Sequence, residues 1–228
     1  MKRFLILMVT VLGLGLSTSA SALMIDKTNW GDCLGTSDCI IGGATLTSSI
    51  RSFEEKTVNG ETGLGISGGR TGGEIDVDEW IHIAFSAAQI VNEIQILFLF
   101  NGPEFGDPQE IGLIMGTSSM GYVAPASVQA SGEDTLTLSG FDAAATWASC
   151  GSTSQSGSGC FTISNPFGAT GLGALSFGAF SVIPRDTNND SDYSIGSVHT
   201  VAVPEPATLV CLAFGLVGLG FGAKRRIS

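Results

Sequence analysis

Carboxylate side chains gather in three short segments of the chain, and their spacing suits the binding of a hard divalent cation. In the first segment Glu74, Asp76 and Asp78 alternate, so an extended backbone would place them on one side. The second segment, 101–110, is rich in turn residues, and the third, 186–193, carries oxygen ligands at alternate positions. Ca2+ takes roughly six to eight oxygen ligands from flexible loops. We therefore expect a calcium site that draws on two or more of Glu74, Asp76, Asp78, Asp107, Glu110, Asp190 and Asp192.

Two other interpretations of these acids stay open. Each segment taken alone is also typical of a solvated turn, and the third departs from the EF-hand loop, because Ser191 and Ser197 stand where that loop has glycine and glutamate. A secreted glycoside hydrolase would use two carboxylates that face each other at roughly 5–9.5 Å. The abundance of acids does not identify such a pair, and His82 and His199 are the two histidines available as bases. We assign no catalytic residue and expect no enzyme activity, with the hydrolase as the alternative.

Short runs of β-branched, aromatic and aliphatic residues fill the middle of the chain, separated by Gly, Ser, Asn, Asp and Pro. The segments 80–85 and 194–203 alternate between apolar and polar residues, as half-buried strands do. The segment 94–100 is almost continuously apolar, which is typical of a central strand covered on both faces. About ten strands with turns between them predict an all-β domain over residues 23–203, a single jelly-roll-like β-sandwich.

Charge separates the ends of the chain from its middle. Lys and Arg number 10, and five of them are Lys2, Arg3, Lys224, Arg225 and Arg226. The middle holds the other five against twenty acids, once Glu205 is set aside from the 21 in the chain. A domain with this balance repels phosphate groups. We therefore expect no binding to nucleic acid or to an anionic lipid surface.

The N-terminus has the three parts of a secretory signal peptide. Lys2 and Arg3 are a basic start, residues 4–16 are apolar, and residues 17–22 are small. We expect signal peptidase to cut after Ala22, so that residues 1–22 are removed as the chain crosses the inner membrane.

The C-terminal segment 204–228 also has three parts. Pro204, Glu205 and Pro206 form a box that ends any preceding strand, because proline lacks a backbone N–H. Residues 207–223 are apolar and predict a single transmembrane helix, which at ~1.5 Å per residue spans roughly 25 Å. The basic end that follows, Lys224, Arg225 and Arg226, predicts a cytoplasmic location for that end.

This order of box, helix and basic end resembles the PEP-CTERM sorting signal of Gram-negative, exopolysaccharide-producing bacteria. In that family the box is recognised by an exosortase, a membrane-embedded cysteine protease and transpeptidase, which removes the helix. The resemblance implies a precursor anchored in the inner membrane and a product at the cell surface or in the extracellular matrix. An ordinary C-terminal membrane anchor is the alternative. The segments 58–69, 74–79, 90–100, 106–110 and 190–193 also look like the ectodomain of one PEP-CTERM subgroup, which implies architecture and no activity.

Four cysteines of the middle fall into two local couples, Cys33 with Cys39 and Cys150 with Cys160. In an exported chain, such short spacings predict disulfide bonds. A four-thiolate zinc site is the alternative, although the spacings lack the C-x2-C pattern. The low-complexity segment 149–159 is expected to be a tethered loop.

These features together predict a non-catalytic exported protein of the surface or matrix, processed by an exosortase and associated with exopolysaccharide or biofilm. Calcium and carbohydrate are its candidate ligands. Carbohydrate would bind through an aromatic face, for which the candidates are Trp30, Trp80, Tyr122, Trp147 and Tyr193.

Overall fold

The computed structural model describes residues 21–69, 71–100, 110–118, 121–132, 135–154, 157–180 and 191–203, with the side chains of 121–124, 132 and 151–158 left aside. Residues 1–20 of the predicted signal peptide, the Pro204-Glu205-Pro206 box, the apolar segment and the basic end lie outside these ranges, as do Asp107 and Asp190. Within the described ranges, no helix has the length and apolar character needed to cross a membrane. Residues Ser21–Ala202 form one compact unit.

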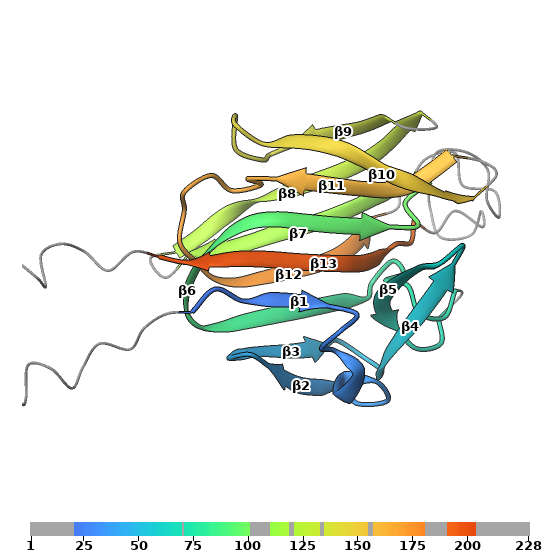
Figure 1. Cartoon of the computed structure of the whole chain (residues 1–228), viewed down its shortest axis with the longest axis horizontal. Helices are drawn as coiled ribbons and strands as arrows, with labels where there is room; N and C mark the ends of the chain where they lie inside the picture. Colours follow the sequence, from blue (N-terminus) through green and yellow to red (C-terminus); the bar gives the residue numbers. More distant parts are fainter. Residues whose placement is uncertain are drawn as a thin grey trace, which may run out of the picture. The chain divides into compact units, whose positions relative to one another are not determined.

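The described residues form one antiparallel sheet of 13 strands and a short 3-10 helix, η1 (Gly31–Cys33) (Figure 1). The strands are β1 (Met24–Asp26), β2 (Asp38–Ile41), β3 (Ala44–Ser48), β4 (Phe53–Val58), β5 (Glu61–Ile66), β6 (Trp80–Leu97), β7 (Ile111–Ser118), β8 (Gly121–Gly132), β9 (Thr135–Ser139), β10 (Thr146–Ser154), β11 (Gly157–Ser164), β12 (Leu172–Phe180) and β13 (Ser194–Ala202). The prediction of an all-β domain is therefore confirmed.

Strand β6 connects the two parts of the sheet, because it changes hydrogen-bonding partners along its 18 residues. Its first part pairs with β3 and β12, and its second part pairs with β13 and β11. The main path through the sheet is β4-β5-β13-β6-β12-β7-β8-β9. A sandwich of two separate sheets was expected, with distinct strands at 80–85 and 90–100. The hydrogen bonds instead run continuously through one long strand that ends at Leu97.

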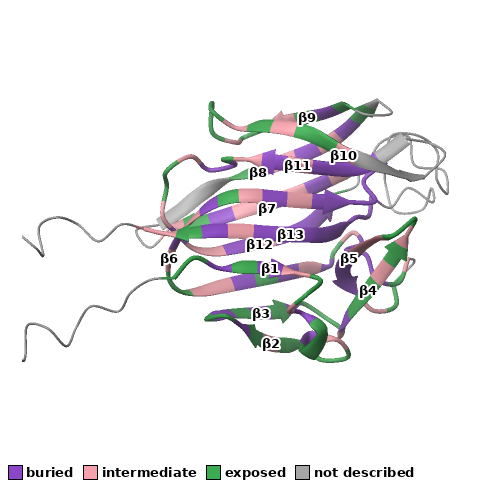
Figure 2. Cartoon of the chain, in the orientation of Figure 1, coloured by how far each residue is buried: buried purple, intermediate pink, exposed green. Residues whose placement is uncertain are grey.

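One hydrophobic core collects side chains from both parts of β6. Ile81 and Ile83 come from the first part, and Val91, Ile94 and Ile96 from the second; all are buried. The alternation of buried and exposed residues along the strands is visible in Figure 2. The sheet thus presents one face to the core and one outward, as the period of two predicts.

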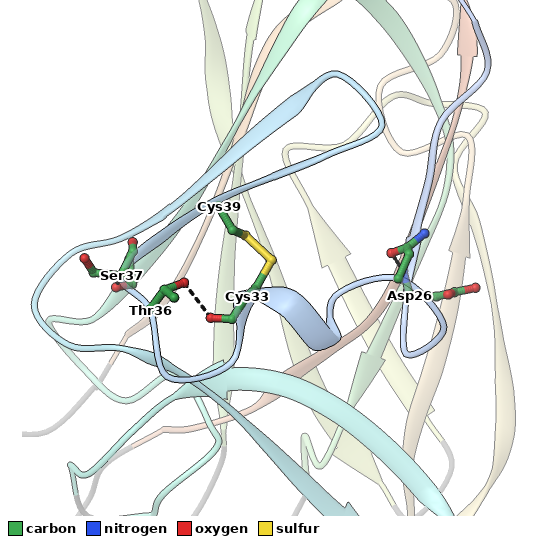
Figure 3. Close-up of a disulfide and its surroundings, with 7 residues drawn as sticks. Asp26, Cys33, Thr36, Ser37 and Cys39 are labelled. Carbon is green, nitrogen blue, oxygen red and sulfur yellow. Dashed lines mark hydrogen bonds between the residues drawn. A yellow bond between two sulfur atoms is a disulfide. The ribbon is translucent and has the colours of Figure 1, made fainter.

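Both predicted cysteine couples lie at disulfide distance. The Cα atoms of Cys33 and Cys39 are 5.3 Å apart, and this disulfide links η1 to β2 (Figure 3). The hydroxyl of Thr36 donates a hydrogen bond of 2.6 Å to the Cys33 carbonyl beside it. The Cα atoms of Cys150 and Cys160 are 5.2 Å apart.

The segment 149–159 is not the tethered loop that its composition predicts. It contributes to two strands of a hairpin, in which Ser149 pairs with Phe161 and Ser152 with Gly159. Strand β11 is held on its other side by β6. The second disulfide crosses between the two strands, so pairing outweighs the low β-propensity of the serine- and glycine-rich sequence.

Candidate functional site

Five acidic side chains are buried in the described part of the chain, which is unusual because carboxylates are seldom removed from water. Asp76 and Asp192 are each 7% exposed, and Glu74 is 1% exposed. Glu79 and Glu110 are buried as well. Three of the five, Glu74, Asp76 and Asp192, form what we call the acid cluster with their neighbours Thr71 and Lys56.

The connection between β5 and β6, described for residues 67–69 and 71–79, brings two acids of the acid cluster into place. It lies directly on β5, because a Cβ added at Gly65 would come within 2.2 Å of the Gly73 carbonyl oxygen. Hydrogen bonds fix the loop on both sides: the Ile66 N–H donates to the Glu74 carbonyl at 2.9 Å, and the Ile75 N–H donates to the Tyr193 carbonyl at 2.7 Å. The backbone of residues 74–75 therefore bridges β5 and the start of β13, next to Asp192.

The chain supplies its own partners for the acids. Lys56 on β4 places Nζ 2.5 Å from Glu74 Oε2. The Thr71 hydroxyl lies 2.9 Å from Asp76 Oδ1 and 2.7 Å from Asp192 Oδ2. A hydroxyl has a single hydrogen to donate. Thr71 thus donates to one carboxylate at a time. The second carboxyl group can hydrogen-bond to the Thr71 oxygen only as a donor, which requires that this carboxyl group is protonated.

The electrostatics of the acid cluster agree with a retained proton. Burial, the largest cause, acts together with the charges of Glu74 and Asp76 and raises the pKa of Asp192 to about 8, against the opposing effects of the Thr71 hydrogen bond and Lys56. Desolvation is the dominant cause, because it penalises the charged form of a carboxyl group. Burial likewise raises the pKa of Glu79, against a hydrogen bond from the Asp76 backbone.

The predicted metal ligands are only partly brought together. Glu74, Asp76 and Asp192 meet in the acid cluster, although Asp192 is more than one hundred positions away in sequence. Asp78 does not lie on the same side as Asp76, which corrects the expected alternation. Its φ of 72° turns the backbone, so that Asp78 is exposed and Glu79 is buried in its place. The Asp76 N–H donates to Glu79 Oε2 at 3.1 Å.

Glu110 lies at the start of β7 and accepts a hydrogen bond from the Phe100 backbone N–H. The next backbone N–H, that of Ile111, donates to the Ser191 hydroxyl at 3.0 Å. Two further predicted ligands, Asp107 and Asp190, lie outside the described residues.

The carboxylate oxygens of the acid cluster are the donor type that Ca2+ prefers. Side chains of the protein already contact these oxygens, however: Lys56 pairs with Glu74, and Thr71 hydrogen-bonds with Asp76 and Asp192. Among the residues that the structure describes, no group of three or more His, Cys, Asp or Glu side chains is placed to hold a metal ion.

Sequence reasoning missed Lys56, Thr71 and Glu79 as members of the site. Thr71 contacts Asp192 across a separation of 121 positions, and no local pattern announces such a contact. Glu79 offered a signal in its acidic side chain, but the assumption of an extended segment placed it on the wrong side.

The C-terminal segment is the part of the chain that matches a known family. The model of the PEP-CTERM protein-sorting motif matches residues 202–226. The match begins at Ala202, where β13 ends. No curated protein matches the chain.

Proposed function

We propose that this chain, a PEP-CTERM sorting-motif protein, is an exported surface or matrix protein that is released from its membrane anchor by an exosortase and associates with exopolysaccharide. The motif implies an exported precursor, anchored in a membrane and processed for display at the surface. The observation that carries the proposal is the position of that motif. The motif begins at the last residue of β13, so removal of residues 207–228 would leave every described strand intact.

The test is to follow the size and location of the protein in its host and in a strain that lacks the exosortase. With the exosortase, the released protein should lack residues 207–228; without it, the full-length precursor should stay in the membrane fraction. A chain with Pro204→Ala, Glu205→Ala and Pro206→Ala should behave as in the deficient strain, and Asp38→Ala on the exposed edge should behave as wild type. Recovery of peptides from the Lys224–Arg226 region in the released protein would refute the proposal.

A non-catalytic role is part of the same proposal. A hydrolase needs its two carboxylates in a cleft that a polysaccharide enters. The acids that meet in this structure are at most 7% exposed, so their burial favours an internal role over attack on a substrate. A glycan-hydrolysis assay of the wild-type protein and of Asp76→Asn would overturn this if the wild type cleaved a polysaccharide and the variant did not.

Calcium binding is a second proposal, supported by the concentration of buried acids in a chain of net charge -11. Glu74, Asp76 and Asp192 supply the donor oxygens, and Lys56 and Thr71 would have to yield their positions to the ion. A divalent ion would relieve the mutual repulsion of the acids.

A further inference from the structure

Four adjacent strands, β3, the first part of β6, β12 and β7, share an outward face on the side opposite the core. We call it the central outer face. Its register is continuous: Thr47 pairs with His82, His82 with Ser176, and Ser176 with Met115. The residues between these positions, such as Leu46, Ile81 and Phe177, point into the core and are buried. The face is therefore a set of parallel rows of side chains across neighbouring strands.

The central outer face carries no Asp, Glu, Lys or Arg on those four strands, although the whole chain has a net charge of -11. Its outward positions are Thr45, Thr47, Trp80, His82, Ala84, Ala174, Ser176, Gly178, Phe180, Ile111, Leu113, Met115 and Thr117. Asp38, on the edge strand β2, lies at its margin. A charge-free area of hydroxyl, aromatic and aliphatic groups in so acidic a protein suits an uncharged ligand, because the face offers no charge to pair with an ionic one.

Trp80 lies across the face instead of packing into the core. It pairs with Gly178 on β12, and a Cβ added at Gly178 would come within 2.7 Å of three indole carbons. Glycine at this position therefore lets the indole lie over the backbone of β12. Trp80 is half-buried, so part of its ring stays accessible. Two residues further along β12, on the same face, Phe180 is 50% exposed.

Hydrogen-bonding groups stand beside the two aromatic rings. His82 Nδ1 lies 2.8 Å from the Ser176 hydroxyl, and His82 is exposed, so Nε2 is available to a ligand. Thr47 is exposed in the same row. A sugar ring presents an apolar face of C–H groups and a rim of hydroxyls. The flat rings and the hydroxyl and imidazole groups complement these two parts.

The other aromatic candidates whose side chains are described do not offer such a surface. Trp30 and Tyr193 are fully buried. Trp147 packs edge-on against the core residue Phe161, with ring centroids 6.0 Å apart. The side chain of Tyr122 lies outside the described set. Trp80 is the candidate that the structure places on an open face.

We propose that the central outer face binds a neutral polysaccharide chain, with Trp80 and Phe180 stacked on sugar rings and His82, Ser176 and Thr47 bonded to hydroxyls. The inference rests on the proposed association with exopolysaccharide and names the surface and the ligand class. A second copy of this chain is the other candidate occupant, because Ile111 and Leu113 continue the rows of Phe180 and Trp80, and the test below distinguishes the two occupants.

The test is affinity electrophoresis of the mature protein, purified from its host, in gels containing a neutral β-glucan (hydroxyethyl cellulose), a neutral α-glucan (dextran) or anionic alginate. We expect at least one neutral glucan to retard the protein and alginate to leave it unaffected. Trp80→Ala and Phe180→Ala should each weaken binding at least about tenfold, and His82→Ala should weaken it several-fold. Met24→Ala, an exposed apolar residue on β1, is the matched control and should bind as wild type. Circular dichroism melts would confirm that every variant is folded.

Three results would overturn the inference: no retardation in either neutral glucan, equal binding by wild type and by the folded Trp80→Ala and His82→Ala variants, or stronger binding to alginate. Sedimentation of wild type and of Trp80→Ala tests for a second copy. A dimer that forms in the wild type and is lost in the variant would show that a second copy occupies the face. The sorting proposal fails separately. If the exosortase processes the protein and the glucans do not retard it, only the glycan inference is lost.

Discussion

The hydroxyl of Thr71 lies between two aspartates, 2.9 Å from Asp76 Oδ1 and 2.7 Å from Asp192 Oδ2. One hydrogen cannot serve both carboxylates, and burial raises the pKa of Asp192, so Asp192 retains a proton under conditions in which an isolated aspartate would have lost it. A buried carboxyl that keeps its proton makes folding depend on pH in the direction opposite to that of a salt-bridged acid. The acid cluster is thus as much a determinant of stability as a candidate site.

The stability of the domain should fall as pH rises from about 4 to about 8. The pKa of Asp192 is raised from its ordinary value to about 8 in the folded protein, so the folded state binds more protons than the unfolded state in this window. The contribution is fully present below the unfolded pKa and is lost as pH passes the folded one. For one proton the slope reaches about 1.4 kcal/mol per pH unit. Urea unfolding of wild type and Asp192→Asn across this range measures it, and the variant should show a clearly smaller slope. An exposed Asp38→Asn control should keep the wild-type slope; equal slopes in all three proteins would contradict the assignment.

Replacement of Lys56 by methionine should destabilise the domain by about 1–3 kcal/mol. The change removes the ammonium group beside the buried Glu74 carboxylate, and a charge that loses its counter-ion in a dry site is costly. The side chain of Lys56 is 27% exposed, so we expect less than the full cost of a completely buried pair. The double variant Lys56→Met/Glu74→Met should recover part of the loss. Chemical denaturation measures both, with Lys27→Met as the exposed control; a loss in the double variant larger than that of the single variant would contradict the pairing.

Millimolar Ca2+ should raise the melting midpoint of the mature protein if the acid cluster takes an ion. A ligand that binds only the folded state stabilises it by about 2.7 kcal/mol at one hundred times its dissociation constant. The measurement is a thermal melt with Ca2+, with Mg2+ and with chelator at fixed ionic strength. Asp76→Asn should remove the Ca2+ effect. A midpoint that does not change with Ca2+ would leave the acids with a purely internal role.

Loss of either disulfide should cost about 2–3 kcal/mol, because each closes a short loop in the unfolded chain. The Cys33–Cys39 bond spans 6 positions and the Cys150–Cys160 bond spans 10. Each paired Cys→Ala variant should unfold at lower denaturant than wild type, and a variant with all four cysteines replaced should agree in its midpoint with the reductant-treated wild type. Non-reducing peptide maps that join Cys33 to Cys150 or Cys160 would refute the pairing.

The fold class was predictable because most strands have a local sequence signal, either alternation or a continuous apolar run. The alternation in 80–85 and in 194–203 predicts strands that the structure contains. It identifies the core-facing residues only in 80–85, because β13 lies between β5 and β6 and residues 194–198 are all buried. The continuity of β6 was not predictable, because nothing local shows that residues 86–89 carry the strand on to a second set of partners. The strands within 149–159 were missed for a related reason, since pairing and a disulfide override a composition typical of a loop.

The site was predictable only in part. Period two places Glu74 and Asp76 together, and the prediction holds up to the turn at Asp78. The backbone there adopts a positive φ, which only the folded context requires. Thr71 and Asp192 come together because the loop after β5 reaches the start of β13. Such a meeting depends on the topology of the whole sheet and not on any sequence pattern.

The pairing of β1 with β13 joins the first strand of the folded unit to the last, with Met24 opposite His199 and Asp26 opposite Ser197. Contacts between distant parts of a chain form slowly, because the intervening loop must close first. In a chain that crosses a membrane from its N-terminus onward, the residues of β1 reach the far side well before those of β13. Strand β13 also fills the position between β5 and β6, so the sheet stays incomplete until then. In the exported precursor proposed above, completion of the sheet therefore waits for the residues that lead into the sorting motif, and the order of events that we expect is translocation, closure of the sheet and then release from the membrane.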